Sequence, residues 1–181
     1  NVKDYSFEAL YNRIAYVTQK AVLFSGSIAD NIAFGESREA VTDDMMHQAI
    51  SLAQAEEFVS KLDGRTDYHI AQGGRNVSGG QKQRLSIARA LARGAEILIF
   101  DDSFSALDYR TDAALRAGLS EKLTDIPKII VAQRVGTIRH AERILVLDEG
   151  RIVGNGTHEE LMKNCDVTRD LLPLYMDDSC S

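Results

Sequence analysis

The sequence has no tryptophan, only two prolines and no long apolar run among its 181 residues. Its apolar runs, such as residues 97–100 and 129–132, are far shorter than the roughly 18 residues of a membrane-spanning helix. Residues 1–20 lack both the basic start and the apolar middle of a secretory signal peptide. We therefore expect neither a membrane span nor a leader here. The first residue, Asn1, suggests a piece of a longer chain.

Cysteine is equally scarce, because only Cys165 and Cys180 occur, both near the end of the sequence and without CxxC spacing. A zinc site or a redox motif would need such spacing, so we expect two free thiols in a reducing compartment. The histidines likewise show no ligand spacing, and we expect them at the surface or at helix caps.

The charge is mildly acidic, with a net charge of −6 and a pI of about 5.2. A nucleic-acid-binding protein usually carries a basic stripe. The one basic cluster is spread around a single predicted helix, at Lys82, Arg84, Arg89 and Arg93. We therefore expect no nucleic-acid partner. The hydrophobic share of 44% and the charged share of 27% are typical of one soluble globular domain.

Short apolar runs alternate with segments of helical periodicity along the chain. The predicted strands are residues 13–18, 97–100, 128–132 and 143–147, with a return strand at 151–153. The predicted helices are residues 79–93, 109–123 and 158–163, with one or two helices at 43–62 and a loop at 63–77. Thr157 and Glu160, three residues apart, predict a capping box at the start of the last helix. Apolar strands between helices indicate an α/β fold with a mostly parallel sheet covered on both faces. The long insert after the first strand predicts a separate helical lobe.

A serine–glycine–glycine turn opens the helix predicted at residues 79–93, within the run VSGGQ at residues 77–81. The first turn of a helix presents unpaired N–H groups and the positive end of the helix dipole. Gly79 and Gly80 would let a phosphate approach the backbone, and the hydroxyl of Ser78 adds a donor. The same residues also fit a plain turn that only begins a helix.

Two carboxylates, Asp101 and Asp102, directly follow the apolar run at residues 97–100. Open α/β sheets bind ligands at the carboxyl ends of their strands. One carboxylate could hold Mg²⁺ while the other faces an attacking water, although two solvated acids in a turn would give the same pattern. Gln19 and Gln133 end two further predicted strands, so polar side chains from three strands are expected to converge at one edge of the sheet.

Taken in order, these segments resemble the ABC ATPase family along essentially the whole chain. Gln19 stands at the position of the Q-loop, and residues 77–81 at that of the signature motif. Residues 97–102 (ILIFDD) resemble the Walker B motif, and residues 105–108 (SALD) resemble the D-loop. Gln133 stands at the position of the switch residue. The run of signature, Walker B and D-loop is highly specific for this family.

The resemblance implies one ATPase domain with two parts. Residues 1–20 and 95–181 would form a RecA-like P-loop ATPase core, and residues 21–94 an α-helical subdomain that carries the signature. Residues 23–35 (LFSGSIADNIAFG) are similar to the exporter branch, where this segment meets the coupling helices of the membrane domain. Residues 72–76 resemble the exporter loop at the same interface. A location on the cytoplasmic face of the cell membrane follows from the resemblance.

The same resemblance implies ATP and Mg²⁺ as cofactors and gives each residue a role. Asp101 would hold Mg²⁺, with Gln19 adding a ligand and sensing the membrane domain. Asp102 would be a weak general base, and Gln133 a weak contact to the γ-phosphate. Asp108 would cross the dimer interface, and it also fits a helix N-cap. The residues that would bind the ATP held by the partner subunit are Ser78, Gly79, Gly80 and Gln81.

The phosphate loop GxxxxGK[ST] is absent, because no glycine in this sequence is followed by lysine. In the family, this Walker A motif would lie upstream of Asn1, together with the aromatic residue that stacks on adenine. We therefore expect that the present sequence alone binds MgATP poorly or not at all.

Three positions depart from the family pattern. Asp102 stands where the family usually has Glu, Gln133 where it usually has His, and Gln72 where exporters often have Glu. ABC domains pair head to tail, and each ATP lies between the Walker motifs of one subunit and the signature of the other. The departures would therefore weaken this chain's own site, while its intact signature would complete the partner's site. We predict a heterodimer of half-transporters with one weak and one competent ATP site, which exports an unidentified substrate.

Two other functions remain open at this stage. One is a regulatory ATP-binding module that barely hydrolyses ATP and mainly completes its partner's site. The other is a soluble ABC ATPase of DNA repair or translation, which a coiled-coil insert or a basic surface would support. Neither feature occurs in the sequence, and the exporter-like residues 23–35 argue against the second function.

Overall fold

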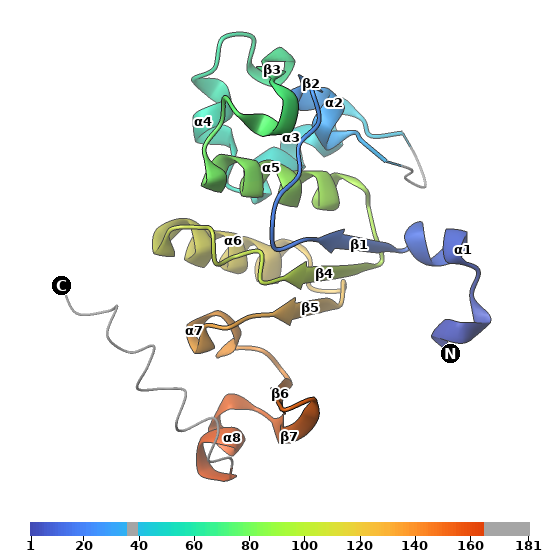
Figure 1. Ribbon diagram of the computed structural model, residues 1–181, viewed down its shortest axis with the longest axis vertical. Coiled ribbons are helices and arrows are strands. Elements are labelled where there is room, and N and C mark those ends of the chain that lie inside the picture. The colour runs from blue at the N-terminus through green and yellow to red at the C-terminus, as the bar shows by residue number, and fades with distance from the viewer. Residues whose placement is uncertain (36–39, 165–181) are drawn as a thin grey trace, which may run out of the picture. The chain divides into compact units, whose positions relative to one another are not determined.

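The computed structural model describes residues 1–35 and 40–164 (Figure 1). The chain forms two compact units, Asn1–Val131 and Ala132–Ser181. Cys165 and Cys180, which we expected to be free thiols, lie outside the described residues. No helix among the described residues is both long and apolar enough to cross a membrane. The predicted boundaries between an ATPase core and a helical subdomain stay a prediction.

A parallel three-stranded sheet forms the centre of the first unit, as predicted. Its strands are β1 (Ile14–Val17), β4 (Ile97–Asp101) and β5 (Lys128–Val131), in the order β1-β4-β5. The register places Val17 beside Phe100, and Asp101 beside Val131. The carboxyl ends of the three strands therefore meet at the same edge of the sheet.

The described residues of the first unit also form six α-helices (Figure 1). Their bounds are α1 (Phe7–Tyr11), α2 (Ile28–Ile32), α3 (Asp43–Leu52), α4 (Glu56–Ser60), α5 (Gly79–Ala92) and α6 (Tyr109–Lys122). The segment predicted as one or two helices at residues 43–62 is two helices, because Gln54 adopts a left-handed backbone with φ of 56°. This conformation cannot continue a right-handed helix, so it turns the chain between α3 and α4.

The segment at residues 63–77, predicted as a loop, also contains short regular elements. They are the 3-10 helices η2 (Arg65–Asp67) and η3 (Gln72–Gly74) and the strand β3 (His69–Ile70). β3 pairs antiparallel with β2 (Gly26–Ser27), more than forty residues earlier in the chain. A two-residue strand has no periodicity of its own, so its position depends on this distant partner rather than on local sequence.

The core of the first unit lies between the sheet and α5. Ala15, Val17, Leu98 and Phe100 point to one face of the sheet and are all at most 2% exposed. The buried residues of α5, which contacts β1, belong to the same hydrophobic cluster. Full burial of a Val, Leu or Phe side chain, as at Val17, Leu98 and Phe100, contributes about 1.5–3 kcal/mol. This face packs the signature helix against β1, which pairs with β4, the strand that ends in Asp101.

The opposite face of the sheet is less covered than the sequence predicted. Tyr16, Ile129 and Val131 lie on this face, and each is about half exposed. Side chains alternate between the faces of a strand, so these residues are the neighbours of the buried ones. Among the described residues of the first unit, the predicted cover is therefore complete on one face only.

The second unit consists of α7 (Val135–Ile138), the hairpin of β6 (Ile144–Asp148) and β7 (Arg151–Gly156), and α8 (His158–Asn164). The hairpin turn holds Glu149 and Gly150 at positive φ, as a two-residue turn between antiparallel strands requires. The predicted capping box at the start of α8 is present. The amide of Thr157 donates to the carboxylate of Glu160 at 2.8 Å, and the amide of Glu160 donates to Thr157 Oγ1 at 3.3 Å.

Candidate functional site: the signature turn and the carboxylate edge

The signature turn, defined as residues 78–81, begins α5 with a reciprocal pair of hydrogen bonds. Ser78 Oγ accepts from the amide of Gln81 at 3.2 Å, and Gln81 Oε1 accepts from the amide of Ser78 at 2.8 Å. This capping box satisfies two amides but leaves the hydroxyl proton of Ser78 available to a ligand. The turn is therefore a stable helix start and can also bind an anion.

Gly79 and Gly80 occupy the first two positions of α5, where amides have no partner inside the helix. A Cβ at Gly79 would meet no heavy atom within 4 Å, so this side of the turn is open. A Cβ at Gly80 would lie 3.5 Å from the carbonyl oxygen of Ala106. The first turn of α5 contains no acidic residue, so the positive end of its dipole is not neutralised there. The signature turn thus fits a phosphate group.

Asp101 and Asp102, which we call the carboxylate edge, each accept a hydrogen bond from a side chain on or just after β1. The hydroxyl of Tyr16 donates to Asp101 Oδ2 at 2.5 Å. Gln19 Nε2 donates to Asp102 Oδ2 at 2.9 Å. The bond to Asp101 is the main reason that the pKa of Tyr16 is raised above its ordinary value of 10.0. Of the predicted contacts between Gln19 and the two acids, the structure shows the one to Asp102.

Asp102 differs from Asp101 in burial and in backbone conformation. Its side chain is buried, and its φ is 45°, in the left-handed region. Asp is among the few residue types other than glycine that adopt this region readily. The amide of Asp102 donates to the carbonyl of Val131 at 2.8 Å, and its carbonyl accepts from Ser105 Oγ at 2.7 Å. Asp102 is thus fixed between β5 and the turn that follows β4.

The donor set of the carboxylate edge fits a magnesium ion bound together with a nucleotide. Asp101 offers a carboxylate oxygen, and the amide nitrogen of Gln19 bonds Asp102, so its carbonyl oxygen can serve as a further ligand. Mg²⁺ prefers such hard oxygen ligands, and it usually takes one or two carboxylates and completes its shell with phosphates and water. Among the described residues, no group of three or more acidic, histidine or cysteine side chains could form a closed metal cage.

Asp108 caps α6, as the sequence allowed. Its Oδ1 accepts from the amide of Thr111 at 2.9 Å, and its Oδ2 accepts from the Thr111 hydroxyl at 2.7 Å. These bonds hold the pKa of Asp108 below its ordinary value of 3.8. The side chain is exposed, and Ala106 lies beside the signature turn. The structure therefore brings the SALD turn next to the signature turn within one chain.

Gln133 lies two residues beyond β5, belongs to the second unit and is exposed. Its predicted contact with a γ-phosphate stays a prediction. Gln72 begins the 3-10 helix η3 and is also exposed.

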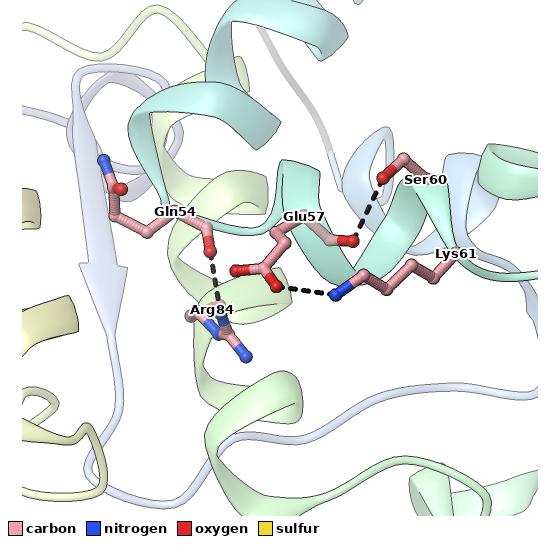
Figure 2. Close-up of polar contacts among 5 residues, drawn as sticks. All are labelled: Gln54, Glu57, Ser60, Lys61 and Arg84. Atoms are coloured by element: carbon pink, nitrogen blue, oxygen red, sulfur yellow. Dashed lines mark hydrogen bonds and ion pairs between the residues drawn. The ribbon is translucent and has the colours of Figure 1, made fainter.

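The sequence did not reveal three residues that hold the site or the signature helix in place. Tyr16 shares a sheet face with Asp101, and this follows from the parallel register once β1 and β4 are paired. Gln83, only 2% exposed, donates to the carbonyl of Thr18 at 3.2 Å and so joins the signature helix to the end of β1. Arg84 contacts the corner between α3 and α4, as Figure 2 shows. No local motif marks any of these contacts.

The exporter-like segment at residues 23–35 forms an aromatic surface that the signature helix supports. The rings of Phe24 and Phe34 lie 4.2 Å apart, and both are roughly half exposed. The guanidinium of Arg89, from α5, lies 5.4 Å from the first ring and 5.8 Å from the second. Arg89 also donates to the carbonyl of Asn31 at 2.6 Å. A displacement of this surface would therefore act directly on α5.

Known proteins resemble this chain in sequence and structure. The family model described as ABC transporter matches residues 1–105. An uncharacterized ABC transporter ATP-binding protein of Mycobacterium tuberculosis is 45% identical over 166 residues, which are 91% of this chain and 28% of that protein. The ATP-dependent lipid A-core flippase of Xanthomonas oryzae pv. oryzae is 43% identical over 161 residues, which are 89% of this chain and 27% of that protein.

A solved structure agrees with these relatives. The structure of a bacterial Atm1-family ABC exporter with ATP bound matches with a TM-score of 0.87 and 32% identity, over 92% of this chain and 29% of that one. The chain thus spans less than a third of the length of each of these proteins. The mixed α/β fold with its parallel sheet agrees with a RecA-like P-loop ATPase. The chain belongs to the ABC transporter family, and it resembles the ATP-binding part of that family's exporters.

Proposed function

We propose that this chain is the ATP-binding part of an exporter half-subunit with an asymmetric role in a heterodimer. Its signature turn completes the ATP site of a partner half-subunit, whereas its own carboxylate edge hydrolyses ATP slowly. The observation that carries the proposal is the pairing of an intact Ser78-Gly79-Gly80 turn with two weakened positions, Asp102 and Gln133. The soluble ABC ATPases of DNA repair and translation fit less well, since the relatives are exporters.

The signature turn acts on the ATP held by the partner's Walker motifs. The amides of Gly79 and Gly80 and the hydroxyl of Ser78 bind γ-phosphate oxygens, and the positive end of α5 favours the negative charge that develops there. Donors fixed before the reaction need no reorganisation during it. Asp108, exposed at the start of α6, reaches across the interface while it caps its own helix.

At the carboxylate edge, Asp101 and Gln19 would hold the magnesium ion that accompanies ATP. When bound, Mg²⁺ neutralises phosphate charge during phosphoryl transfer. Tyr16 orients Asp101, and the amide nitrogen of Gln19 orients Asp102. Gln19 would thereby contact both the magnesium ion and Asp102, the acid that faces the attacking water. It lies just beyond the end of β1, the strand that α5 covers.

Asp102 is a poor general base in this arrangement because of its length. The family's usual Glu is one methylene longer, so the Asp carboxylate lies about an ångström or more further from the attacking water. A misplacement of about 1 Å can cost on the order of a hundredfold in rate. Gln133 adds a second weakness, since an amide can donate a hydrogen bond to a phosphate but cannot carry a proton.

The aromatic surface of Phe24 and Phe34 is the proposed contact to the coupling helices of the membrane domain, together with residues 72–76. Exposed aromatic pairs of this kind are typical of protein interfaces. Arg89 transmits movement from this surface to the signature helix. The domain then sits at the cytoplasmic face of a membrane as part of a longer transport protein.

The proposal is tested by restoring the family residues in the full-length heterodimer. The partner's catalytic acid is first mutated, so that ATP turnover reports only this chain's site. The double variant Asp102→Glu, Gln133→His should then raise turnover by about tenfold or more. Asp125→Glu, an exposed acid in the loop before β5, is the matched control and should change nothing. A double variant no faster than wild type contradicts the proposal.

A regulatory module that binds ATP without hydrolysing it is the second candidate. It is favoured by the occurrence of both weakened positions in the same predicted ATP site. The two candidates differ in the residual turnover of the wild-type chain when the partner's site is silenced. Measurable hydrolysis that Asp101→Ala abolishes supports the slow ATPase, and turnover equal to that of Asp101→Ala supports the regulatory module.

A further inference from the structure

One arginine of α5, the signature helix, connects this helix to the corner at Gln54 between α3 and α4. Arg84 lies one turn after Gly80 on α5. Its Nη1 donates to the carbonyl oxygen of Gln54 at 2.8 Å (Figure 2). Its Nε lies 3.4 Å from the carbonyl oxygen of Gly80. A single guanidinium thus bonds both the first turn of the signature helix and a residue 30 positions earlier in the sequence.

The corner that Arg84 holds has an unusual backbone. Gln54 joins α3 to α4 with a φ of 56°, and its carbonyl points to Arg84 instead of continuing a helix. The ring of Phe58, on α4, lies under the guanidinium at 4.8 Å. At the end of α4, Lys61 pairs with Glu57 at 2.6 Å, and Arg84 bonds the Gln54 carbonyl (Figure 2). The guanidinium is therefore fixed by a carbonyl and by a ring.

Lysine could not reproduce this arrangement. A guanidinium is planar, donates along several directions and stacks on a ring, whereas an ammonium is a point charge on a flexible stem. Burial lowers the pKa of Arg84, while Asp108 and Glu57 oppose that change. The cleft beside Arg84 is lined by the corner, by α5 and by the start of α6, including Asp108 and Arg110. Arg84 therefore stands where the insert, the signature helix and the SALD turn meet.

We propose that Arg84 is a positioning residue for the signature turn. It fixes the first turn of α5 against the Gln54 corner, and the grip of Ser78, Gly79 and Gly80 on the partner's γ-phosphate depends on that contact. The inference rests on the proposed function, because it concerns the same signature turn. The new element is that α3 and α4 act on the signature turn through the guanidinium of Arg84. A shift of the Gln54 corner would then release or tighten the contacts of the signature turn with the phosphate.

The test measures ATP turnover against ATP concentration in the full-length heterodimer with Arg84→Ala, Arg84→Lys and Phe58→Leu. Arg84→Ala should raise the half-saturating ATP concentration by about tenfold, and Arg84→Lys by about threefold. Phe58→Leu keeps an apolar side chain but removes the ring, and in combination with Arg84→Ala its effect should not add. Arg110→Ala, which removes an exposed guanidinium from the same cleft, is the control and should leave the curve unchanged.

A purely structural role for Arg84 would give a different result. It would lower the amount of folded protein and the maximal rate, and leave the half-saturating ATP concentration of the folded fraction unchanged. That result overturns the proposal. If Arg84→Ala does not fold, the half-saturating ATP concentration of Arg84→Lys distinguishes the two roles instead. Ser78→Ala is measured alongside. If Ser78→Ala impairs turnover and neither Arg84 variant shifts the curve, only the positioning role fails. If Ser78→Ala also has no effect, the proposed function itself fails.

Discussion

The signature turn and the carboxylate edge reach their geometry by opposite routes. In the signature turn, Ser78 and Gln81 bond each other across three positions of one helix. In the carboxylate edge, Asp101 and Asp102 depend on Tyr16 and Gln19, which lie 85 and 83 positions away. The first can form as soon as α5 does, whereas the second exists only after β1 and β4 have paired. We therefore expect the carboxylate edge to be the more easily disturbed of the two.

The two regions also differ in what surrounds them. Gly79 has open space where a side chain would be, and its turn carries the positive end of a helix. Asp102 is buried and bonded through its backbone to β5 and to the following turn. One region is built to receive a phosphate from outside, and the other holds its own side chains in place. Substitutions can therefore damage one region and spare the other.

Phe100→Ala should give the largest effect on stability and should act mainly on the carboxylate edge. Phe100 is fully buried one residue before Asp101, and its ring lies 4.9 Å from that of Phe104. Truncating a buried Phe to Ala costs about 3–5 kcal/mol, through lost burial and the cavity that remains. Urea denaturation measures the loss, with the exposed Phe7→Ala as control. A loss below about 1 kcal/mol would mean that the sheet is not the core.

Gly79→Ala should damage the signature turn and leave the fold intact. A Cβ there meets nothing within 4 Å, so the helix should gain about 0.5–1 kcal/mol of stability from the less flexible residue. The same methyl group stands where the phosphate must approach, so turnover at the partner's site should fall by about tenfold or more. Thermal unfolding and ATP turnover are measured on one preparation. A stable variant with normal turnover would remove Gly79 from the phosphate site.

Gln19→Ala should weaken the carboxylate edge modestly. The substitution removes the donor to Asp102 Oδ2, and a hydrogen bond to a charged group is worth about 1.5–3 kcal/mol, toward the lower end here because Gln19 is exposed. The change in unfolding free energy is compared with that of the neighbouring exposed Lys20→Ala. Equal changes in the two variants would show that Asp102 does not need Gln19. Such a result would weaken the contrast between the two regions.

Acid should give the smallest effect, at the cap of α6. Hydrogen bonds from Thr111 lower the pKa of Asp108 below 3.8, so the ionised cap stabilises the fold above that value and is lost as the pH falls through the lower folded value. Asp108→Asn keeps an oxygen that accepts from the Thr111 amide but does not titrate. Between about pH 5 and pH 2, the wild type should lose more stability than this variant. Parallel acid unfolding curves would contradict the assignment.

Local signals in the sequence were sufficient for the signature turn. The Ser-Gly-Gly-Gln pattern predicts the helix start, which is present, and the structure adds a capping box between Ser78 and Gln81. The Thr157 and Glu160 pair at α8 and the Asp108 cap at α6 were predicted in the same way. Such caps involve residues three positions apart, so the sequence contains all the information that their geometry needs.

Contacts that depend on distant pairing were not predictable to the same degree. The convergence of strand ends followed from the parallel sheet, and the structure shows it for Gln19 and Asp102. The bond between Tyr16 and Asp101, the corner at Gln54 and the strand β3 were missed, because each needs a partner far away in the sequence. The uncovered sheet face at Ile129 and Val131 was missed as well, since an apolar run predicts burial on both sides.

The most direct measurement compares Ser78→Ala with Asp102→Asn in the full-length heterodimer, as steady-state ATP turnover under identical conditions. Removing one preorganised donor costs on the order of a hundredfold or more, so Ser78→Ala should nearly abolish turnover through the partner's competent site. Asp102→Asn alters only the slow site and should leave most of the turnover in place. If Asp102→Asn instead abolishes turnover while Ser78→Ala preserves it, the asymmetric assignment of the two regions is wrong.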